Sequence, residues 1–252
     1  MTGEPNWPPE PLHVAVDVVP IGLSPEGLQV LLVRRPYPPF EGYFALPGTF
    51  SRPDETLEDS PSRALLDKTG VRDVHLEQLA TYDQPTRPGV PGRDPRGRVV
   101  SVAFLALLGP AAVRTVTTDP TVAFFPVANA PTPLAFDHDR MLRDAIERLR
   151  AKTRYAPMVF ALLPDEFTIP ELQSAYEALL GEVLDERNFR RDLHNADVIE
   201  PAGRTRSDGP GRPATLYRYR DGSFAVDAGE RRLAERIARS GRGGPGDDAD
   251  GQ

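Results

Sequence analysis

The chain has 252 residues, of which 39% are hydrophobic and 27% charged, and its formal net charge is −7. This length suits one large domain or two ordinary ones. Cysteine is absent, which excludes disulfides, thiolate metal sites and cysteine nucleophiles. No basic start followed by an apolar run opens the chain, and no apolar stretch approaches the roughly 20 residues that span a bilayer. We therefore expect a cytoplasmic protein.

Short strands alternate with one helix in the first half of the chain. Residues 1–11 are expected to be disordered. The valine- and leucine-rich segments predict strands over 13–19, 28–33, 43–46, 74–82, 98–107 and 121–127. The stretch 20–27 contains proline and glycine and predicts a hairpin loop, and the helix is expected between Gly48 and Gly70. A loop rich in proline, glycine and arginine over 85–96 is long enough to suggest a functional role.

Helices dominate from residue 138 onward. Asp137 is placed to cap a helix over 138–152 that joins the two halves. Thr168 is the predicted cap of the next helix, which has Pro170 in its first turn and ends at Gly181. Asp185 then caps a helix over 186–195. The short turn between these last two helices is typical of a helix-turn-helix.

The helix over 186–195 has an apolar face and a basic one. Phe189 and Leu193 share the inner face, while basic and amide side chains point outward, as suits DNA phosphates and base edges. Strands at 198–200 and 216–219 follow, and the glycine- and proline-rich connection between them resembles a wing that could enter a minor groove. The candidate DNA contacts are Arg187, Asn188, Arg190, Arg191, His194, Arg204, Arg206 and Arg212. The alternative is a helical dimerisation module with a solvated charged face.

The segment ALPGTFSRPDETLEDSPSRALLDKTGV, residues 45–71, resembles the Nudix box, G-x5-E-x7-R-E-U-x-E-E-x-G-U with U apolar. Thr49 stands where the box begins with glycine, whereas the neighbouring Gly48 belongs to the preceding LPG. The Glu, Arg and closing Gly of the pattern fall on Glu55, Arg63 and Gly70. We assign Gly48, Glu55, Arg63 and Gly70 structural roles, with an ion pair between Glu55 and Arg63.

The departures from this box carry the functional prediction. In hydrolytic Nudix proteins, the three Glu of R-E-U-x-E-E share a helical face and bind Mg²⁺. Here these positions are Ala64, Asp67 and Lys68, and a lysine opposes cation binding. The resemblance therefore implies a Nudix scaffold without a catalytic residue or a bound metal, although Asp67 with Glu58 or Asp59 remains an alternative, weak metal site.

Pro61 bears on the same helix. If Thr56 caps the helix, Pro61 lies past the first turn and removes a backbone hydrogen bond. If Ser60 caps it, Pro61 takes the favoured first position and the helix is short.

Arginines and aromatic residues could bind a nucleotide on this scaffold. Guanidinium groups suit a diphosphate, and aromatic rings suit a base. The candidate effector-binding residues are Arg34, Arg35, Phe40, Tyr43, Arg93 and Arg98.

A degenerate Nudix domain followed by a winged helix resembles the NrtR family, the Nudix-related regulators of NAD metabolism. The segments FALLPDEFTIPELQSAYEALLG, DERNFRRDL and GPGRPATLYRY carry this resemblance together with ALPGTF. It implies an α+β fold, in which a Nudix α/β/α sandwich with a mixed sheet precedes a winged helix. It also implies a homodimer that represses genes of NAD synthesis or salvage by binding double-stranded DNA, and is controlled by ADP-ribose or a related nucleotide.

The expected domains are a Nudix-like effector-binding domain over 12–153, including the linker helix, and a winged helix over 154–225. A C-terminal helix and disordered tail are expected over 226–252. Two other functions stay open, an active ADP-ribose pyrophosphatase with a DNA-binding appendage and a scaffold that binds protein.

Overall fold

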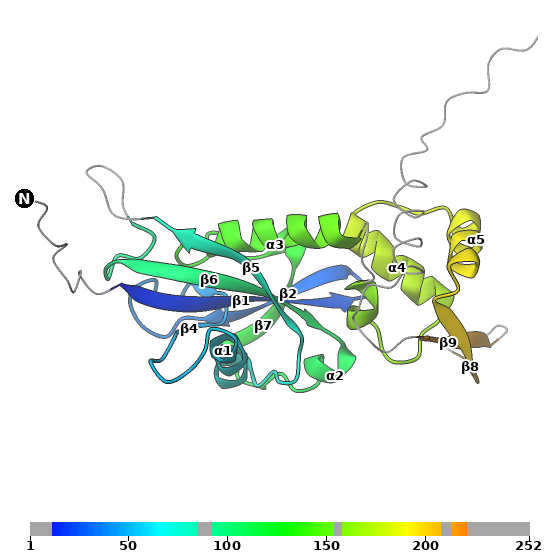
Figure 1. Cartoon of the computed structure of the whole chain (residues 1–252), viewed down its shortest axis with the longest axis horizontal. Coiled ribbons are helices and arrows are strands. Elements are labelled where there is room, and N and C mark those ends of the chain that lie inside the picture. The colour runs from blue at the N-terminus through cyan, green and yellow to red at the C-terminus, as the bar shows by residue number, and fades with distance from the viewer. Residues whose placement is uncertain (1–11, 85–91, 154–157, 208–212, 221–252) are drawn as a thin grey trace, which may run out of the picture. The chain divides into compact units, whose positions relative to one another are not determined.

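A computed structural model describes residues 12–84, 92–153, 158–207 and 213–220 (Figure 1). The described residues up to Gly22, with Gln29–Ala145, form one compact unit. Leu23–Leu28 and the described residues from Ile146 onward form a second. The regions expected to be disordered, 1–11 and the tail within 226–252, lie outside the described residues. No helix in the described part of the chain is both long and apolar enough to cross a bilayer.

A seven-stranded mixed sheet forms the centre of the first unit. The strand order is β3-β2-β1-β6-β5, with β4 also paired to β1 and β7 to β2. β1 and β6 run parallel, with His13 opposite Val99, whereas β5 is antiparallel to β6. The strands are β1 His13–Ser24, β2 Gly27–Arg34, β3 Phe44–Ala45, β4 Gly48–Phe50, β5 Leu76–Asp83, β6 Val99–Leu108 and β7 Val122–Pro126.

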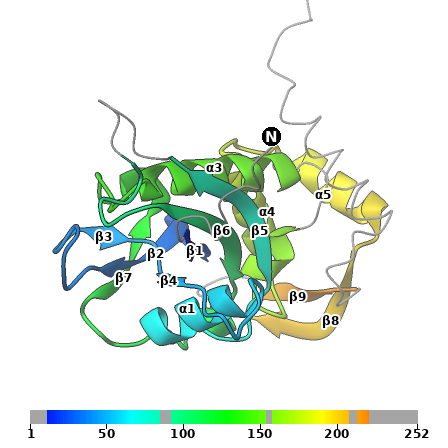
Figure 2. The ribbon, with the colours of Figure 1, turned by 60° about the vertical axis from the view of Figure 1, so that its left-hand side comes forward.

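Helices cover both faces of this sheet (Figure 2). α1, Asp59–Thr69, and the short α2, Pro110–Val113, lie on one face, and the first half of α3, His138–Thr153, lies on the other. Because both faces are covered, β1 and β6 are nearly continuous apolar runs. Ala64 and Leu65 of α1 pack against Val16, Val18 and Phe104 in the core. The Tyr82 hydroxyl donates to Asp144, 2.9 Å away, and so ties β5 to α3.

The predicted strands are confirmed, with shifted ends. β1 continues to Ser24, so the turn to β2 is shorter than the predicted loop over 20–27. β4 and α2 were not predicted. Both are short, and β4 depends on its pairing with β1, where Phe50 lies opposite Ala15.

α1 begins at Asp59, but the first helix-type hydrogen bond lies before it, from the Ser60 N–H to the Thr56 carbonyl over 3.2 Å. The next such bond, to the Leu57 carbonyl, would need an N–H at residue 61. Pro61 removes that bond, as expected for a helix capped by Thr56. Thr56 and Asp59 exchange hydrogen bonds just before the helix, with Thr56 Oγ1 donating to the Asp59 carboxylate over 2.8 Å. Gly70 ends the helix with φ 77°, and a Cβ there would lie 2.8 Å from the Thr115 carbonyl oxygen, so glycine is required.

The second unit contains the predicted helix-turn-helix. Its elements are the end of α3, the 3₁₀ helix η2 Met158–Leu162, α4 Ile169–Leu180, α5 Glu186–Ala196, β8 Ile199–Arg206 and β9 Ala214–Tyr219. Thr168 and Glu171 form a capping box at the start of α4, and Gly181 ends the helix in a left-handed conformation. The caps predicted at Thr168 and Asp185 are confirmed.

Side chains fix the turn between α4 and α5. The Glu177 carboxylate accepts from the Leu184 N–H over 2.9 Å, and the Gln173 amide donates to the Leu184 carbonyl over 2.9 Å. Tyr176 and Phe189 then meet edge to face between the two helices. The orientation of α5 against α4 is therefore set by packing and by hydrogen bonds.

The β8–β9 hairpin is longer than predicted. β8 extends to Arg206, so Arg204 and Arg206 lie on a strand and not in the connecting loop. Phe167 pairs with Tyr217 as a third, one-residue strand. Arg212 lies outside the described residues.

Candidate functional site

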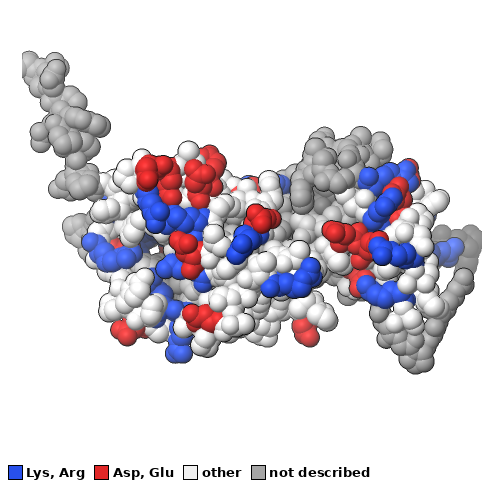
Figure 3. Space-filling model, turned by 90° about the horizontal axis from the view of Figure 1, so that it is seen from below, with Lys and Arg blue, Asp and Glu red and all other residues white. Residues whose placement is uncertain are grey.

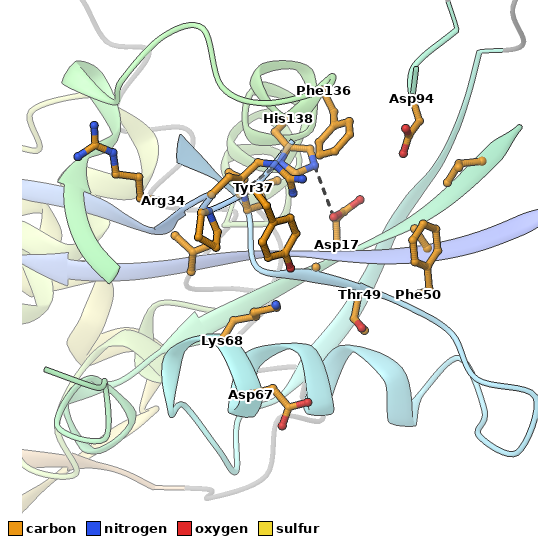
Figure 4. Close-up of a pocket in the computed structure, with 18 of the residues that line it drawn as sticks. Asp17, Arg34, Tyr37, Thr49, Phe50, Asp67, Lys68, Asp94, Phe136 and His138 are labelled. Atoms are coloured by element: carbon orange, nitrogen blue, oxygen red, sulfur yellow. Dashed lines mark hydrogen bonds and ion pairs between the residues drawn. The ribbon is translucent and has the colours of Figure 1, made fainter. Parts of the chain in front are cut away.

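A cavity of about 470 Å³ opens in the first unit (Figure 4). Its lining comes from β1, the end of β2, β4, α1, the loop before β6 and the start of α3. Elements that are far apart in the sequence therefore converge on it.

Asp17 of β1 is one of two buried acidic groups that line this cavity, 6% exposed, and Asp94 is the other, at 3%. The Asp17 carboxylate accepts a hydrogen bond from the Ser101 hydroxyl, and His138 Nε2 lies 3.5 Å from it (Figure 4). The Leu46 N–H donates to His138 Nδ1 over 2.9 Å. Nδ1 is therefore an acceptor in this hydrogen bond, and Nε2 faces Asp17.

Asp17 is ionised in this setting. Burial alone would raise its pKa, but His138, the Ser101 hydroxyl and the charge of Arg93 outweigh burial and hold the pKa below its usual value. Gly48 completes the enclosure, because a Cβ on this residue would lie 2.1 Å from Asp17 Oδ1. Only glycine fits there.

Two arginines of the loop before β6 are engaged by carboxylates. Arg93, whose side chain is 3% exposed, lies 2.8 Å from Asp137 and 3.6 Å from Asp17. Arg96 donates to Asp94 through two nitrogens, at 2.7 and 3.0 Å. Asp137, the predicted helix cap, thus has its carboxylate bound to Arg93.

Phe136 lies against two guanidinium groups in the same cavity. The Arg35 guanidinium carbon is 4.8 Å from the ring centre, and that of Arg96 is 5.5 Å from it and 5.3 Å from the ring of Phe50. Arg35 Nε donates to the Pro39 carbonyl over 2.7 Å. Its Nη2 is buried without a hydrogen-bond partner.

The cavity brings together three of the six candidate effector-binding residues, Arg34, Arg35 and Arg93. Phe40 and Tyr43 contact each other at 5.9 Å outside the lining, and Arg98 pairs with Asp83 on the neighbouring strand. Asp17, Phe136 and His138 line the cavity and were missed. The signal for Asp17 was available, since it is the one acid within the apolar run of β1.

The box residues form a rigid loop-to-helix connection at one side of the cavity. Arg63 donates to Glu55 over 2.8 Å, to the Phe50 carbonyl over 2.9 Å and to the Thr49 hydroxyl over 3.1 Å. Hydrogen bonds from Arg63, and then from Ser60, lower the pKa of Glu55 to about 2. Glu55 is thus a tightly held anion that serves the loop structure.

The three box positions on α1 lie differently. Ala64 is buried at 1% exposure in the core. Lys68 and Asp67 both line the cavity, and in Figure 4 the two side chains extend from α1 in different directions. The three positions therefore supply one carboxylate, whereas Mg²⁺ takes several oxygen ligands.

Most of the candidate DNA contacts of the second unit are exposed. Arg187, Arg190, Arg191 and His194 are exposed on α5, and Asn188 is half-buried. Phe189 and Leu193 are buried, as predicted.

Acidic partners accompany many of these cations. Arg190 pairs with Glu186 at 2.9 Å, Arg204 with Glu166, and Arg206 with Glu171. Basic and acidic side chains accordingly alternate on the face shown in Figure 3. Arg187 forms no ion pair with the described residues.

Family models match both units. The NUDIX domain model matches residues 11–145, and the NrtR DNA-binding winged helix domain model matches residues 159–219. The α/β/α arrangement with a mixed sheet, followed by a winged helix, is therefore confirmed.

Known proteins resemble the chain over most of its length. It is 36% identical, over 84% of its length and 83% of the relative's, to the "ADPR responsive transcriptional repressor NtrR" of Acinetobacter baylyi. The crystal structure of Shewanella oneidensis NrtR with a 27mer DNA has a TM-score of 0.72 and 37% identity, covering 82% of this chain and 93% of that one. An ADP-ribose pyrophosphatase of Methanocaldococcus jannaschii is 34% identical over 53% of this chain and 73% of its own. With a NUDIX domain followed by an NrtR winged helix, the chain belongs to the NrtR family.

Proposed function

We propose that this chain is a DNA-binding transcriptional repressor of genes for NAD synthesis or salvage, controlled by ADP-ribose or a related NAD-derived nucleotide. One observation carries the proposal. The chain combines the NUDIX and NrtR winged-helix domains, and it resembles a repressor named for its response to ADPR over most of both chains.

DNA binding is assigned to α5 and the β8–β9 hairpin. The buried pair Phe189 and Leu193 orients α5 so that its arginines and His194 face solvent. A solved relative was crystallised with DNA, which supports this role. A homodimer would present two such helices to two half-sites about one helical turn apart.

Effector binding is assigned to the cavity around Asp17 and Phe136. Arginine forks recognise phosphate oxygens, and an exposed aromatic face suits a base or a ribose. The cavity's volume falls within the range of small-molecule sites, roughly 300–1,000 Å³.

The cavity acts as a receptor and not as a hydrolase in this proposal. Magnesium would have to bind where Ala64 offers no ligand and Lys68 adds a positive charge, so we assign no catalytic step to the site. The second candidate, an ADP-ribose pyrophosphatase, is favoured by the 34% identity to such an enzyme. It requires metal ligands that α1 lacks at two of the three positions.

The test joins DNA and effector in one titration. Genomic fragments are first selected by the purified protein, and a selected fragment is labelled for fluorescence anisotropy. Saturating ADP-ribose should weaken its binding, because an effector that prefers one state of the protein shifts the equilibrium between states. Unchanged DNA affinity with ADP-ribose demonstrably bound would reject the control mechanism, and failure to select any fragment would reject the repressor itself.

A further inference from the structure

Five cationic side chains line the cavity: Arg34, Arg35, Lys68, Arg93 and Arg96. Carboxylates already neutralise two of them, since Arg93 pairs with Asp17 and Asp137 and Arg96 with Asp94. Arg34 donates to the Gly42 carbonyl, and in Figure 4 its guanidinium points away from Asp17 and His138. Arg35 and Lys68 form no ion pair with any carboxylate of the described residues. Arg34 also forms no ion pair with these residues, but its guanidinium points away, so Arg35 and Lys68 are the unpaired cations that we consider for ligand binding.

Lys68 occupies the third carboxylate position of the box. Its ammonium group points from α1 into the cavity, below Tyr37 in Figure 4, and the neighbouring Asp67 also lines the cavity. The side chain is exposed, so it can reach a bound ligand without leaving a buried charge behind. A cation thus stands where hydrolytic Nudix proteins hold a metal ion with glutamates.

Arg35 is fixed in place but incompletely bonded. Its Nε donates to Pro39, and its guanidinium lies on Phe136. Nη2 has no partner although it is buried, which is unfavourable unless a ligand supplies an acceptor. Burial and the nearby charge of Arg96 both lower the pKa of Arg35, so an anion would stabilise its charged form.

We propose that Lys68 and Arg35 together replace the divalent metal of this fold and hold the diphosphate of the nucleotide by direct ion pairs. This inference rests on the proposed function and deepens it. The positive charges of Lys68 and Arg35 equal in number the two negative charges of a diphosphate diester. Such a diester does not ionise further, so no metal ion is needed to neutralise it here. Arginine supplies a planar fork and lysine a point charge, both suited to phosphate oxygens. The protein should therefore bind ADP-ribose equally well with and without Mg²⁺.

Isothermal calorimetry of the full chain with ADP-ribose tests this in EDTA and in millimolar Mg²⁺. The wild-type dissociation constant should be the same in both buffers. Lys68→Gln should weaken binding about tenfold, equivalent to about 1.4 kcal/mol, because a charge-assisted hydrogen bond to a phosphate oxygen is lost. Lys68→Arg should keep most of the affinity. Arg72→Gln is the matched control, because Arg72 is exposed just beyond α1, outside the cavity lining.

Lys68→Glu distinguishes the two kinds of site most clearly. With a second carboxylate beside Asp67, the variant should not bind ADP-ribose in EDTA and should bind it partly in Mg²⁺. Binding by the variant, but not by wild type, should therefore depend on the metal. Wild-type binding that requires Mg²⁺ would overturn the metal replacement and leave the proposed effector standing. Equal affinities of wild type and Lys68→Gln would also overturn it. No binding in either buffer would reject the effector, and the ion-pair site with it.

Discussion

Replacing Arg93 by methionine removes the cation that pairs with both Asp17 and Asp137. The Arg93 side chain is 3% exposed. It neutralises Asp17, which lies 3.6 Å away and whose side chain is 9% exposed, and Asp137, which lies 2.8 Å away. Methionine preserves the apolar length of the side chain but leaves Asp17 a buried carboxylate without its cation. Breaking a buried ion pair in this way costs about 3–5 kcal/mol.

We expect the lower end of that range, because Asp17 keeps its Ser101 and His138 contacts and Asp137 can rehydrate. Since about 1 kcal/mol shifts Tm by roughly 2–4 °C for a protein of this size, Arg93→Met should lower the Nudix-domain transition in calorimetry by about 6–12 °C. Arg96→Met is the control. Its partner Asp94 is also an acid, but Arg96 is 44% exposed, so a loss of about 1 kcal/mol or less is expected.

Lowering the pH should reduce the difference in unfolding free energy between Arg93→Met and wild type. The wild-type contribution of Asp17 is present above the ordinary aspartate pKa and declines as pH falls, because its folded pKa is lowered. Without Arg93 that pKa rises, so the variant takes up a proton more readily and loses less on acidification. The double variant Asp17→Asn/Arg93→Met should recover part of the stability at pH 7. A wild-type-like melting temperature for Arg93→Met, or a double variant no more stable than the single one, would refute this reasoning.

Three further predictions concern the box, the cavity and the DNA-binding face. Because Arg63 and Ser60 lower the pKa of Glu55 to about 2, its contribution to stability should be present above about pH 4.5 and fade toward pH 2. In urea titrations, the unfolding free energy of Glu55→Gln should therefore fall less between pH 4.5 and pH 2 than that of wild type. An equal fall in both proteins would contradict this. Gly48→Ala should displace Asp17 and weaken ADP-ribose binding at least tenfold by calorimetry, since its Cβ would meet Oδ1 at 2.1 Å; unaltered affinity would show that the site tolerates the shift. Arg187→Ala should lower the slope of log affinity for DNA against log salt by about one, the value for one phosphate contact, whereas an equal slope would remove Arg187 from the interface.

Local sequence rules were sufficient for most elements. Thr168 with Glu171 three residues later predicts a capping box, and Gly181 and Gly70 end their helices for the backbone reason that favours glycine at such positions. The strands of the first unit follow from their valine and leucine content. Each of these sequence patterns spans only a few residues, so the element can be predicted without knowing which distant segments it contacts.

The cavity depends on contacts between distant segments, and there the prediction from sequence was incomplete. Arg98 was a candidate ligand contact at the start of the strand predicted over 98–107, but it precedes β6, and the register of β5 against β6 places Asp83 beside it. Arg93 was recognised as a candidate without its partner Asp137, because the loop before β6 and the start of α3 meet only in the folded chain. β4 was missed for the same reason, since three residues form a strand there only by pairing with β1.

Phosphorus NMR of ADP-ribose mixed with an equal amount of the protein in millimolar Mg²⁺ tests the receptor function most directly. The diphosphate resonances should broaden or shift on binding and then remain, with no phosphomonoester signals growing over hours. Steady appearance of AMP and ribose 5-phosphate at an enzymatic rate, abolished by EDTA, would contradict the account and make this chain a hydrolase.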